Sequence, residues 1–378
     1  MTPFVFNTTP SIRMGAGEIE NLGEISSAVC TGPVLIVTDT GMVKTGIVGR
    51  AEAILKRAGL SVKTYADVIA DPPEVVVLAA AEMAKDCGLV IGLGGGSSLD
   101  VAKLAALLAG NGGALAEAYG VNTATGPRLP LITIPTTAGT GSEVTPIAIV
   151  TTGASEKMGV VSSLIIPDIA LLDPELTYDL PAHVTAATGI DAMVHAIEAH
   201  ASKSPNNNPV SRALAVEALR LTGGALERAV THPRDTAARA DMLLGSLLAG
   251  QAFANSPVAA VHALAYPVGG HFKVPHGLSN ALVLPHVLRF NAVTHPADYA
   301  VLAPHAFAGS AATADALIDG LVALSKACGL PQALREVGIS RDDLPRLATD
   351  AMNQTRLLVN NPRTVTHDDA LAIYEAAL

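Results

Sequence analysis

The first half of the chain alternates short apolar runs with longer stretches in which apolar residues recur at helical spacing. Such a pattern predicts β-strands separated by helices. We expect helices over about residues 41–60 and 74–86. The predicted strands lie at residues 33–39, 61–67, 88–93, 130–137, 146–151 and 168–174. Because strands and helices alternate, we predict an α/β domain with a parallel, Rossmann-like sheet covered on both faces.

From about Pro181 onward the pattern changes to long Ala- and Leu-rich segments with helical spacing only. Polar or Pro/Gly-containing segments at 204–209, 231–235 and 267–277 interrupt them. A chain of 378 residues also exceeds the length at which a single core stops growing, about 250–300 residues. We therefore predict two domains, an α/β domain over residues 1–181 and an all-helical domain over residues 182–378.

Composition excludes several classes of partner. The net charge of −10 and the absence of a basic run argue against nucleic acid. No 18 apolar residues run together and the N-terminus does not resemble a signal peptide, so we expect neither a membrane span nor export. Three widely spaced cysteines suit a reducing compartment, and we expect the cytoplasm.

Histidine is distributed unevenly. All 11 histidines lie at or beyond His183, and none lies in the first 182 residues. This asymmetry indicates that the two halves carry different chemistry.

The stretch "IGLGGGSSLDVAK" (91–103) runs from an apolar strand through three glycines into a helix. Bare backbone N–H groups at the start of a helix bind phosphate, because the helix dipole is positive there. Gly92 and Gly94 fit a GxG pattern, but Ser97 stands at the third glycine position, and no Gly-Lys-Ser/Thr closes a P-loop. The alternative is a tight turn without a ligand.

Asp39 ends the predicted strand at 33–39. A carboxylate at this position can accept hydrogen bonds from ribose hydroxyls and would repel a 2′-phosphate, which favours NAD over NADP if the strand neighbours the glycine turn. The alternative is that Asp39 only caps the following helix.

A second polar turn, "PTTAGTGSEVT" (135–145), follows another predicted strand and supplies several hydroxyl groups around two glycines. Ligands of α/β proteins bind at the carboxyl ends of the strands. Two such turns on one edge suit a long, two-ended cofactor.

A candidate metal site lies in "ATGIDAMVHAIEAH" (187–200). Asp191 and His195 are four residues apart, so on a helix they share one face and can hold one ion. His200 is nine residues from Asp191 and falls on roughly the opposite side. A surface hydrogen bond between Asp191 and His195 is the alternative.

Two more histidines follow in "HALAYPVGGHFKVPHG" (262–277). A break at Pro267, Gly269 and Gly270 would let the chain turn back, so that His262 and His276 converge. One carboxylate and three imidazoles suit iron or zinc with a coordination position left open. Otherwise His262 is a core histidine and His276 caps a helix.

Together these motifs, with "LLDPELTYDLP" (171–181), make the sequence similar to the iron-containing (group III) alcohol dehydrogenase family. The resemblance extends from Asp39 to about residue 290. It implies the dehydroquinate-synthase-like fold, in which an NAD-binding α/β domain precedes a helical metal-binding domain and catalysis takes place between them. It also implies a homodimer or higher homo-oligomer, in which an N-terminal strand at residues 4–8 could pair across the dimer or lie against its own sheet.

The resemblance also implies site residues. The metal ligands correspond to Asp191, His195, His262 and His276, with iron(II) as the metal and zinc(II) as the alternative. The cofactor contacts correspond to Asp39, Asp71, Gly95, Gly96, Ser97, Asp100, Thr136, Thr137, Thr140 and Lys157. Many members carry a histidine where this chain has Tyr266, and we consider His271 a substitute for it beside the catalytic His262 and His276.

The activity that the resemblance implies is hydride transfer between NAD(H) and a small primary alcohol or aldehyde, in a small apolar pocket with Phe253 as a wall. Alternatives in the superfamily are an enzyme acting on an oxo acid or semialdehyde, such as a maleylacetate reductase or a hydroxybutyrate dehydrogenase, a glycerol dehydrogenase, and a cyclising lyase. An anionic substrate would need a basic residue such as Lys273. A non-catalytic NAD or metal sensor is the remote alternative.

Overall fold

The computed structural model describes residues 3–153 and 156–378. The chain forms two compact units. The α/β unit consists of Asn7–Thr137 and Gly141–Asp179, and the helical unit consists of Leu180–Leu378 together with residues 138–140 and the segment up to Phe6. The tip of the second polar turn, residues 138–140, thus belongs to the helical unit although the strand before it does not.

The α/β unit is built on a six-stranded sheet with the order β1-β9-β6-β4-β2-β3, in which every pairing is parallel. Its strands are β1 (Ser11–Met14), β2 (Val34–Asp39), β3 (Val62–Val68), β4 (Leu89–Gly94), β6 (Leu131–Pro135) and β9 (Ile169–Leu172). Between β2 and β4 the order of the strands reverses, which is where open parallel sheets bind ligands. The predicted fold class, a parallel α/β sheet followed by helices, is confirmed.

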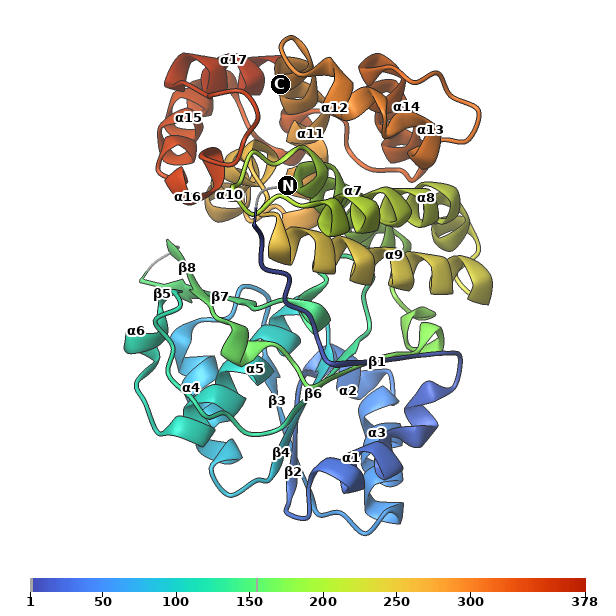
Figure 1. Ribbon diagram of the computed structural model, residues 1–378, viewed down its shortest axis with the longest axis vertical. Coiled ribbons are helices and arrows are strands. Elements are labelled where there is room, and N and C mark those ends of the chain that lie inside the picture. Colours follow the sequence, from blue (N-terminus) through green and yellow to red (C-terminus); the bar gives the residue numbers. More distant parts are fainter. Residues whose placement is uncertain (1–2, 154–155) are drawn as a thin grey trace. The chain divides into compact units, whose positions relative to one another are not determined.

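Both faces of this sheet are buried, as the continuous apolar runs predict. Leu35 and Val37 of β2 belong to the core that also contains side chains of α4 (Glu74–Ala84) and α5 (Gly96–Asn111). Val34 and Ile36, which alternate with them, belong to the core beneath α1 (Leu22–Val29) and α3 (Ile47–Arg57). The two pairs of helices lie on opposite sides of the strands (Figure 1).

Several parts of the α/β unit differ from the prediction. The strand expected at 146–151 is β7 (Ile147–Thr152), but it pairs antiparallel with β8 (Glu156–Val161) in a separate sheet that also contains β5 (Gly120–Val121). The helix expected over 41–60 is two helices, α2 (Thr40–Lys44) and α3, separated at Gly46, whose φ of 81° is left-handed. The short β1 was not predicted.

The helical unit contains the remaining α-helices: α7 (Ala182–Ala201), α8 (Pro209–Thr231), α9 (Thr236–Asn255), α10 (Ala260–Phe272), α11 (His276–Ala292), α12 (Pro296–Ala300), α13 (Ala303–Ala306), α14 (Ala314–Ala327), α15 (Leu344–Met352), α16 (Thr355–Leu358) and α17 (His367–Ala377). The α/β unit adds the short α6 (Leu115–Ala118). The described part of the second half is free of strands, as predicted. In the same described residues, every helix falls short of what a bilayer span requires.

The predicted break at Pro267, Gly269 and Gly270 is wrong. Helix α10 continues through Pro267 to Phe272, because proline removes only one hydrogen bond of an otherwise buried helix. The chain turns at Lys273, whose φ of 57° is left-handed and whose N–H bonds to Gly269 O. His276 then occupies the first position of α11.

The N-terminal segment at residues 4–8 does not pair with the sheet of its own chain, since the described residues there are not in a strand. Instead, the Asn206 side chain accepts a hydrogen bond from Val5 N and donates one to Val5 O. An asparagine amide therefore satisfies both backbone groups of Val5. Pairing of the segment at residues 4–8 across a dimer stays a prediction.

Candidate metal centre

Helix α7 carries two of the predicted ligands on one face. Asp191 and His195 are 2% and 5% exposed, so both polar side chains are removed from water. Their helix is rich in alanine and packs against both α8 and α9. Burial of a carboxylate is costly unless it is paired, which makes this position a candidate for a bound cation.

Helices α10 and α11 bring the other two ligands to α7. His262 lies in the first turn of α10 and is 2% exposed, and His276 begins α11. A side chain at Gly277 would lie 2.4 Å from Ala187 O, so only glycine lets the start of α11 approach α7 this closely. This close contact places His276 next to Asp191.

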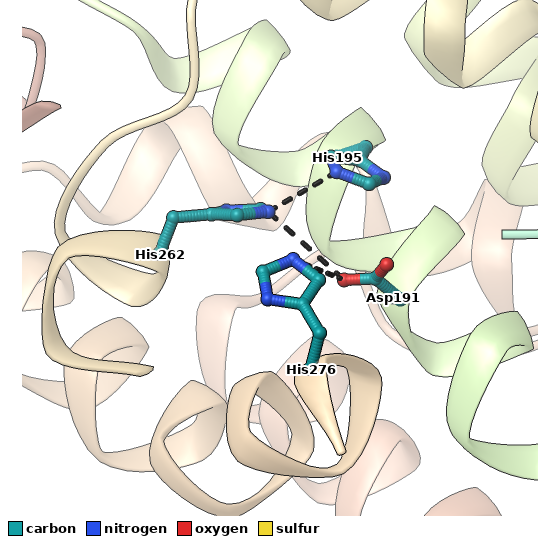
Figure 2. Close-up of side chains that lie close together, drawn as sticks. All are labelled: Asp191, His195, His262 and His276. Atoms are coloured by element: carbon teal, nitrogen blue, oxygen red, sulfur yellow. Dashed lines mark hydrogen bonds and ion pairs between the residues drawn. The ribbon is translucent and has the colours of Figure 1, made fainter. Parts of the chain in front are cut away.

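The four side chains converge on one point (Figure 2). One ligand atom from each of Asp191, His195, His262 and His276 lies within 4.8 Å of the others. His262 Nε2 is 3.1 Å from His195 Nε2 and 4.0 Å from Asp191 Oδ1, and His276 Nε2 is 3.7 Å from the same carboxylate oxygen. Three of the residues are buried, whereas the His276 side chain is 42% exposed.

In two of the histidines, the ring nitrogen that faces away from the cluster makes a hydrogen bond. This bond indicates which of the two ring nitrogens carries the proton. His195 Nδ1 is 3.1 Å from Gly139 O, and a carbonyl only accepts, so His195 carries its proton on Nδ1. His262 Nδ1 is 2.6 Å from Glu198 Oε2 and likewise donates. Burial lowers the pKa of His195 to about 3, against the opposing effect of Asp191, so its ring is neutral.

The residues fit a divalent metal. With both Nδ1 atoms protonated, the two Nε2 lone pairs face each other at 3.1 Å without a proton between them. Two imidazole nitrogens bound tetrahedrally to zinc would lie about 3.4 Å apart, close to this spacing. A cation held by these residues would remove the repulsion between the lone pairs, and the neighbouring Asp191 carboxylate would balance its charge.

Asn280, one turn after His276, completes the surroundings of Asp191. Its Nδ2 donates to Asp191 Oδ1 at 2.6 Å and lies 3.2 Å from His276 Nε2. Burial alone would raise the pKa of Asp191, but the three histidines and this hydrogen bond hold it below its ordinary value. The carboxylate is therefore ionised and available as a ligand.

Sequence analysis missed two residues of this centre, Glu198 and Asn280. Asp191, His195 and Glu198 follow the spacing i, i+4, i+7, which places all three on one face of a helix. Asn280 has the same i+4 relation to His276. These spacings were the available signal.

Other predicted residues lie around the cluster or outside it. Phe253 is buried and stacks on His195, with ring centroids 4.3 Å apart. Tyr266 lies beside His276 with a centroid distance of 5.8 Å. His271 does not join the cluster, because its Nε2 pairs with Asp350 Oδ2 of α15 at 2.6 Å. His200 is also outside it.

The first glycine turn lies beside Asp39 in the α/β unit. Strands β2 and β4 are paired neighbours, and a Cβ added to Gly94 would lie 3.5 Å from Asp39 Oδ2. Gly94 has a φ of 146°, which other residues rarely adopt. Asp39 Oδ1 also accepts from Met42 N at 3.0 Å, so the residue does cap α2 as well. Gly95, the N-cap of α5, leaves the first N–H groups of that helix without a side-chain cap.

The second turn adjoins the first. A Cβ on Gly95 would lie 3.6 Å from Thr137 Cγ2, and the hydroxyl of Thr136 is buried without a hydrogen-bond partner in the described structure. The predicted cofactor residue Asp100 is engaged by the protein itself: it accepts from Ser142 Oγ at 2.5 Å and from Ile149 N at 3.0 Å.

A fully buried lysine, Lys103, to which the sequence analysis assigned no role, connects the helix after the first turn with the second turn and the strand that follows it. Its Nζ donates to Ser142 Oγ at 2.7 Å, to Thr145 Oγ1 at 3.1 Å and to Ile147 O at 2.8 Å. It also lies 3.6 Å from Asp100 Oδ1. Lys103 therefore braces the two turns.

Two further candidates, Asp71 and Lys157, form an ion pair at 2.6 Å. Lys157 Nζ also donates to Thr151 Oγ1, whose hydroxyl donates to Asp71 O. These residues lie together at the edge formed by β7 and β8.

Comparison with known proteins agrees with this architecture. The family model described as iron-containing alcohol dehydrogenase matches residues 9–174, and the model of the C-terminal part of the Fe-containing alcohol dehydrogenase family matches residues 185–378. Together the two matches cover nearly the whole chain.

Individual relatives match over nearly their full lengths. The chain is 40% identical to long-chain-alcohol dehydrogenase 1 of Geobacillus thermodenitrificans (strain NG80-2), over 97% of this chain and 95% of that protein. It is 35% identical to the NAD-dependent methanol dehydrogenase of Bacillus methanolicus, over 99% of both. A crystal structure of 1,3-propanediol oxidoreductase superposes with a TM-score of 0.95 at 34% identity and covers 100% of both chains. The chain belongs to the iron-containing alcohol dehydrogenase family.

Proposed function

We propose that this protein oxidises small primary alcohols, or reduces the corresponding aldehydes, with a metal held by Asp191, His195, His262 and His276 and with NAD as cofactor. The metal we propose is iron(II), with zinc(II) as the alternative. The observation that carries the proposal is the pair of Nε2 lone pairs facing each other at 3.1 Å beside a buried carboxylate. The NAD-dependent methanol dehydrogenase named above supports the choice of cofactor.

When bound, the metal supplies Lewis-acid polarisation of a substrate oxygen, and NAD supplies the electron acceptor. The chain's own residues prepare the site. Gly139 O and Glu198 hold the rings of His195 and His262 with their Nε2 atoms toward the centre. Phe253 stacks on the His195 ring, which is 5% exposed. The exposed side of the cluster, at His276 and Tyr266, is where we place the substrate.

We assign NAD binding to the domain of residues 1–181 and metal binding to that of residues 182–378. The first glycine turn would hold the pyrophosphate at the start of α5, because that helix begins without a side-chain cap. Asp39 would bind the ribose, since it lies beside Gly94. The proposed cofactor residues are Asp39, Asp71, Gly95, Gly96, Ser97, Asp100, Thr136, Thr137, Thr140 and Lys157. His271 is left out of the catalytic set because Asp350 engages its ring.

We further propose a cytoplasmic homodimer or higher homo-oligomer. The three cysteines are free and buried, which suits a reducing compartment. Exposed apolar side chains on the α/β unit, Ile69, Val75 and Leu78, support self-association. Sedimentation equilibrium at several concentrations measures the mass: a monomer of 38.4 kDa throughout would contradict this part of the proposal.

The deciding experiment follows NADH absorbance with the metal-free protein reconstituted separately with iron(II) and zinc(II). The substrates are short primary alcohols, diols, 2-oxo acids and semialdehydes. Metal-dependent turnover of alcohols and aldehydes supports the proposal. Preference for the anionic substrates, removed by Lys273→Met, would instead favour an oxo acid or semialdehyde reductase. No turnover with either metal, despite NAD binding, would contradict catalysis and favour a sensor.

A further inference from the structure

Glu198 is buried next to the proposed metal ligands but is not one of them. It lies on α7, is 5% exposed, and its two carboxylate oxygens accept three hydrogen bonds. Oε2 accepts from Ala259 N at 3.0 Å and from His262 Nδ1 at 2.6 Å, and Oε1 accepts from Val261 N at 2.7 Å. All three donors belong to the beginning of α10.

The first consequence concerns helix α10. Its N-cap residue is Ala259, which has no side chain that could accept from the first turn. Glu198, which is distant in sequence, replaces the missing cap by accepting from two backbone N–H groups. A negative charge at this end of a helix is also favourable because of the helix dipole.

The second consequence concerns the His262 ring. The same carboxylate accepts the Nδ1 proton of His262, so the unprotonated Nε2 points toward His195 and Asp191. An acceptor on the far nitrogen fixes the tautomer and orientation of a histidine ligand and makes it a stronger base. Without Glu198 the ring could rotate or carry its proton on Nε2, where it cannot bind a metal.

The remaining surroundings of Glu198 leave these contacts undisturbed. A small cavity beside it is lined by the neutral polar side chains of Asn291, Tyr299 and Asn361. These three are engaged with one another: Asn291 Nδ2 donates to both Tyr299 Oη and Asn361 Oδ1. The carboxylate is thus balanced by the amides of α10 and by His262.

We propose that Glu198 is a positioning residue, which caps α10 and at the same time holds His262 in the tautomer that binds metal. The inference rests on the metal centre proposed above. It predicts that Glu198 acts on metal affinity through His262 and not through the other three ligands.

The test variant is Glu198→Gln, which keeps the volume of the side chain but replaces one acceptor oxygen by a donor. We expect the affinity for zinc(II) and cobalt(II), measured by competition with a chelator, to fall about 10–100-fold. The change is repeated in two matched backgrounds. With His276→Ala the loss should persist, whereas with His262→Ala it should disappear, because the residue through which Glu198 acts is gone.

Two results would overturn the inference: an unchanged affinity in Glu198→Gln, or an equal loss in both backgrounds. A wild-type protein whose metal binding does not depend on His262 or His276 would contradict the metal centre itself, which is a different outcome.

A second measurement needs no metal and covers the case in which Glu198→Gln folds poorly. Nitrogen-15 NMR of the histidine rings in the metal-free wild type reports which nitrogen carries the proton, with the His262 signal assigned by its loss in His262→Ala. We expect the Nδ1–H tautomer. The Nε2–H tautomer would refute the role of Glu198.

Discussion

The helical unit and the α/β unit build their proposed sites in opposite ways. In the helical unit four large side chains converge, and each histidine that is buried there is held by an acceptor on its outer nitrogen, Gly139 O or Glu198. In the α/β unit the proposed site consists of backbone N–H groups that Gly94 and Gly95 leave uncovered by side chains. The buried polar side chains support this backbone and are not themselves the site.

The difference follows from the chemistry of the two groups that the sites would bind, a metal ion and a pyrophosphate. A metal ion needs a few strong donors at short distances, so its site depends on the protonation and direction of individual side chains. A pyrophosphate is larger and is bound by N–H groups and a helix dipole, so its site depends on the path of the chain. We therefore expect the substitution of any single ligand to weaken metal binding directly. We expect NAD binding to weaken when a substitution removes a side chain that supports the two turns.

The largest expected effect is that of His262→Ala. Losing a ligand removes the Lewis acid from the reaction, so we expect turnover to fall about 1000-fold or more, while the dissociation constant of NAD stays nearly unchanged. Steady-state kinetics and NADH fluorescence titration measure the two quantities. A comparable loss of NAD affinity would contradict the separation of the two sites.

Lys103→Met tests the converse, a substitution that should affect the NAD site and leave the metal site unchanged. Removing the buried amine leaves the Asp100 carboxylate without its neighbouring cation, and Ser142 Oγ and the Ile147 carbonyl without this donor, so we expect the free energy of unfolding to fall by about 3–5 kcal/mol. NAD binding should weaken while zinc(II) affinity is unchanged. Urea unfolding of the metal-free protein measures the first effect.

The matched control is Lys85→Met, because the Lys85 side chain is exposed and forms its ion pair with Glu82, one turn away. We expect a change below about 1 kcal/mol there. Equal effects of the two substitutions would show that Lys103 is not a brace.

Glu143, which lies in the second turn, predicts a dependence of stability on pH. Burial raises the pKa of Glu143 to about 7, against the effects of its backbone hydrogen bond and of Lys103. Between pH 4.5, the ordinary pKa, and pH 7 the unfolded chain loses this proton and the folded protein keeps it. Stability should therefore decrease by about 3 kcal/mol as the pH rises through this window.

Urea unfolding of wild type and Glu143→Gln at pH values across that window isolates the contribution, because Gln does not titrate. We expect the difference between the two proteins to vary with pH, whereas the exposed control Glu82→Gln should follow the wild type. A difference that is constant with pH would mean that Glu143 ionises normally.

A smaller effect is expected from Asp39→Ser. Serine is as good an N-cap as aspartate, so helix α2 should keep its cap while the charge beside Gly94 is removed. We expect the use of NADP relative to NAD to increase about tenfold, measured as the ratio of kcat/KM values. An unchanged ratio would leave capping as the only role of Asp39.

The smallest effect is expected from His271→Gln, which breaks the partly exposed pair with Asp350. We expect less than about 1 kcal/mol of lost stability and turnover close to that of the wild type. A large loss of turnover would place His271 in the reaction.

Much of this protein was determined by local sequence. The strands of the parallel sheet and the helical second half follow from apolar periodicity, because side-chain direction repeats over a few residues in both elements. For the same reason Asp191 and His195 share a face of α7, and the glycine turns follow strands β4 and β6. The sequence also predicts that His262 and His276 converge, but from a break at Pro267 that the structure does not contain; the family motifs imply the same four ligands.

Only the tertiary structure decided which groups meet across long stretches of chain. Glu198 and His262 are 64 residues apart, and Lys103 and Ser142 are 39 apart, so no local period relates them. The pairing of β7 with β8, the continuation of α10 through Pro267 and the engagement of His271 by Asp350 have the same origin. A buried polar group takes the partner that packing brings to it, and packing depends on the whole chain.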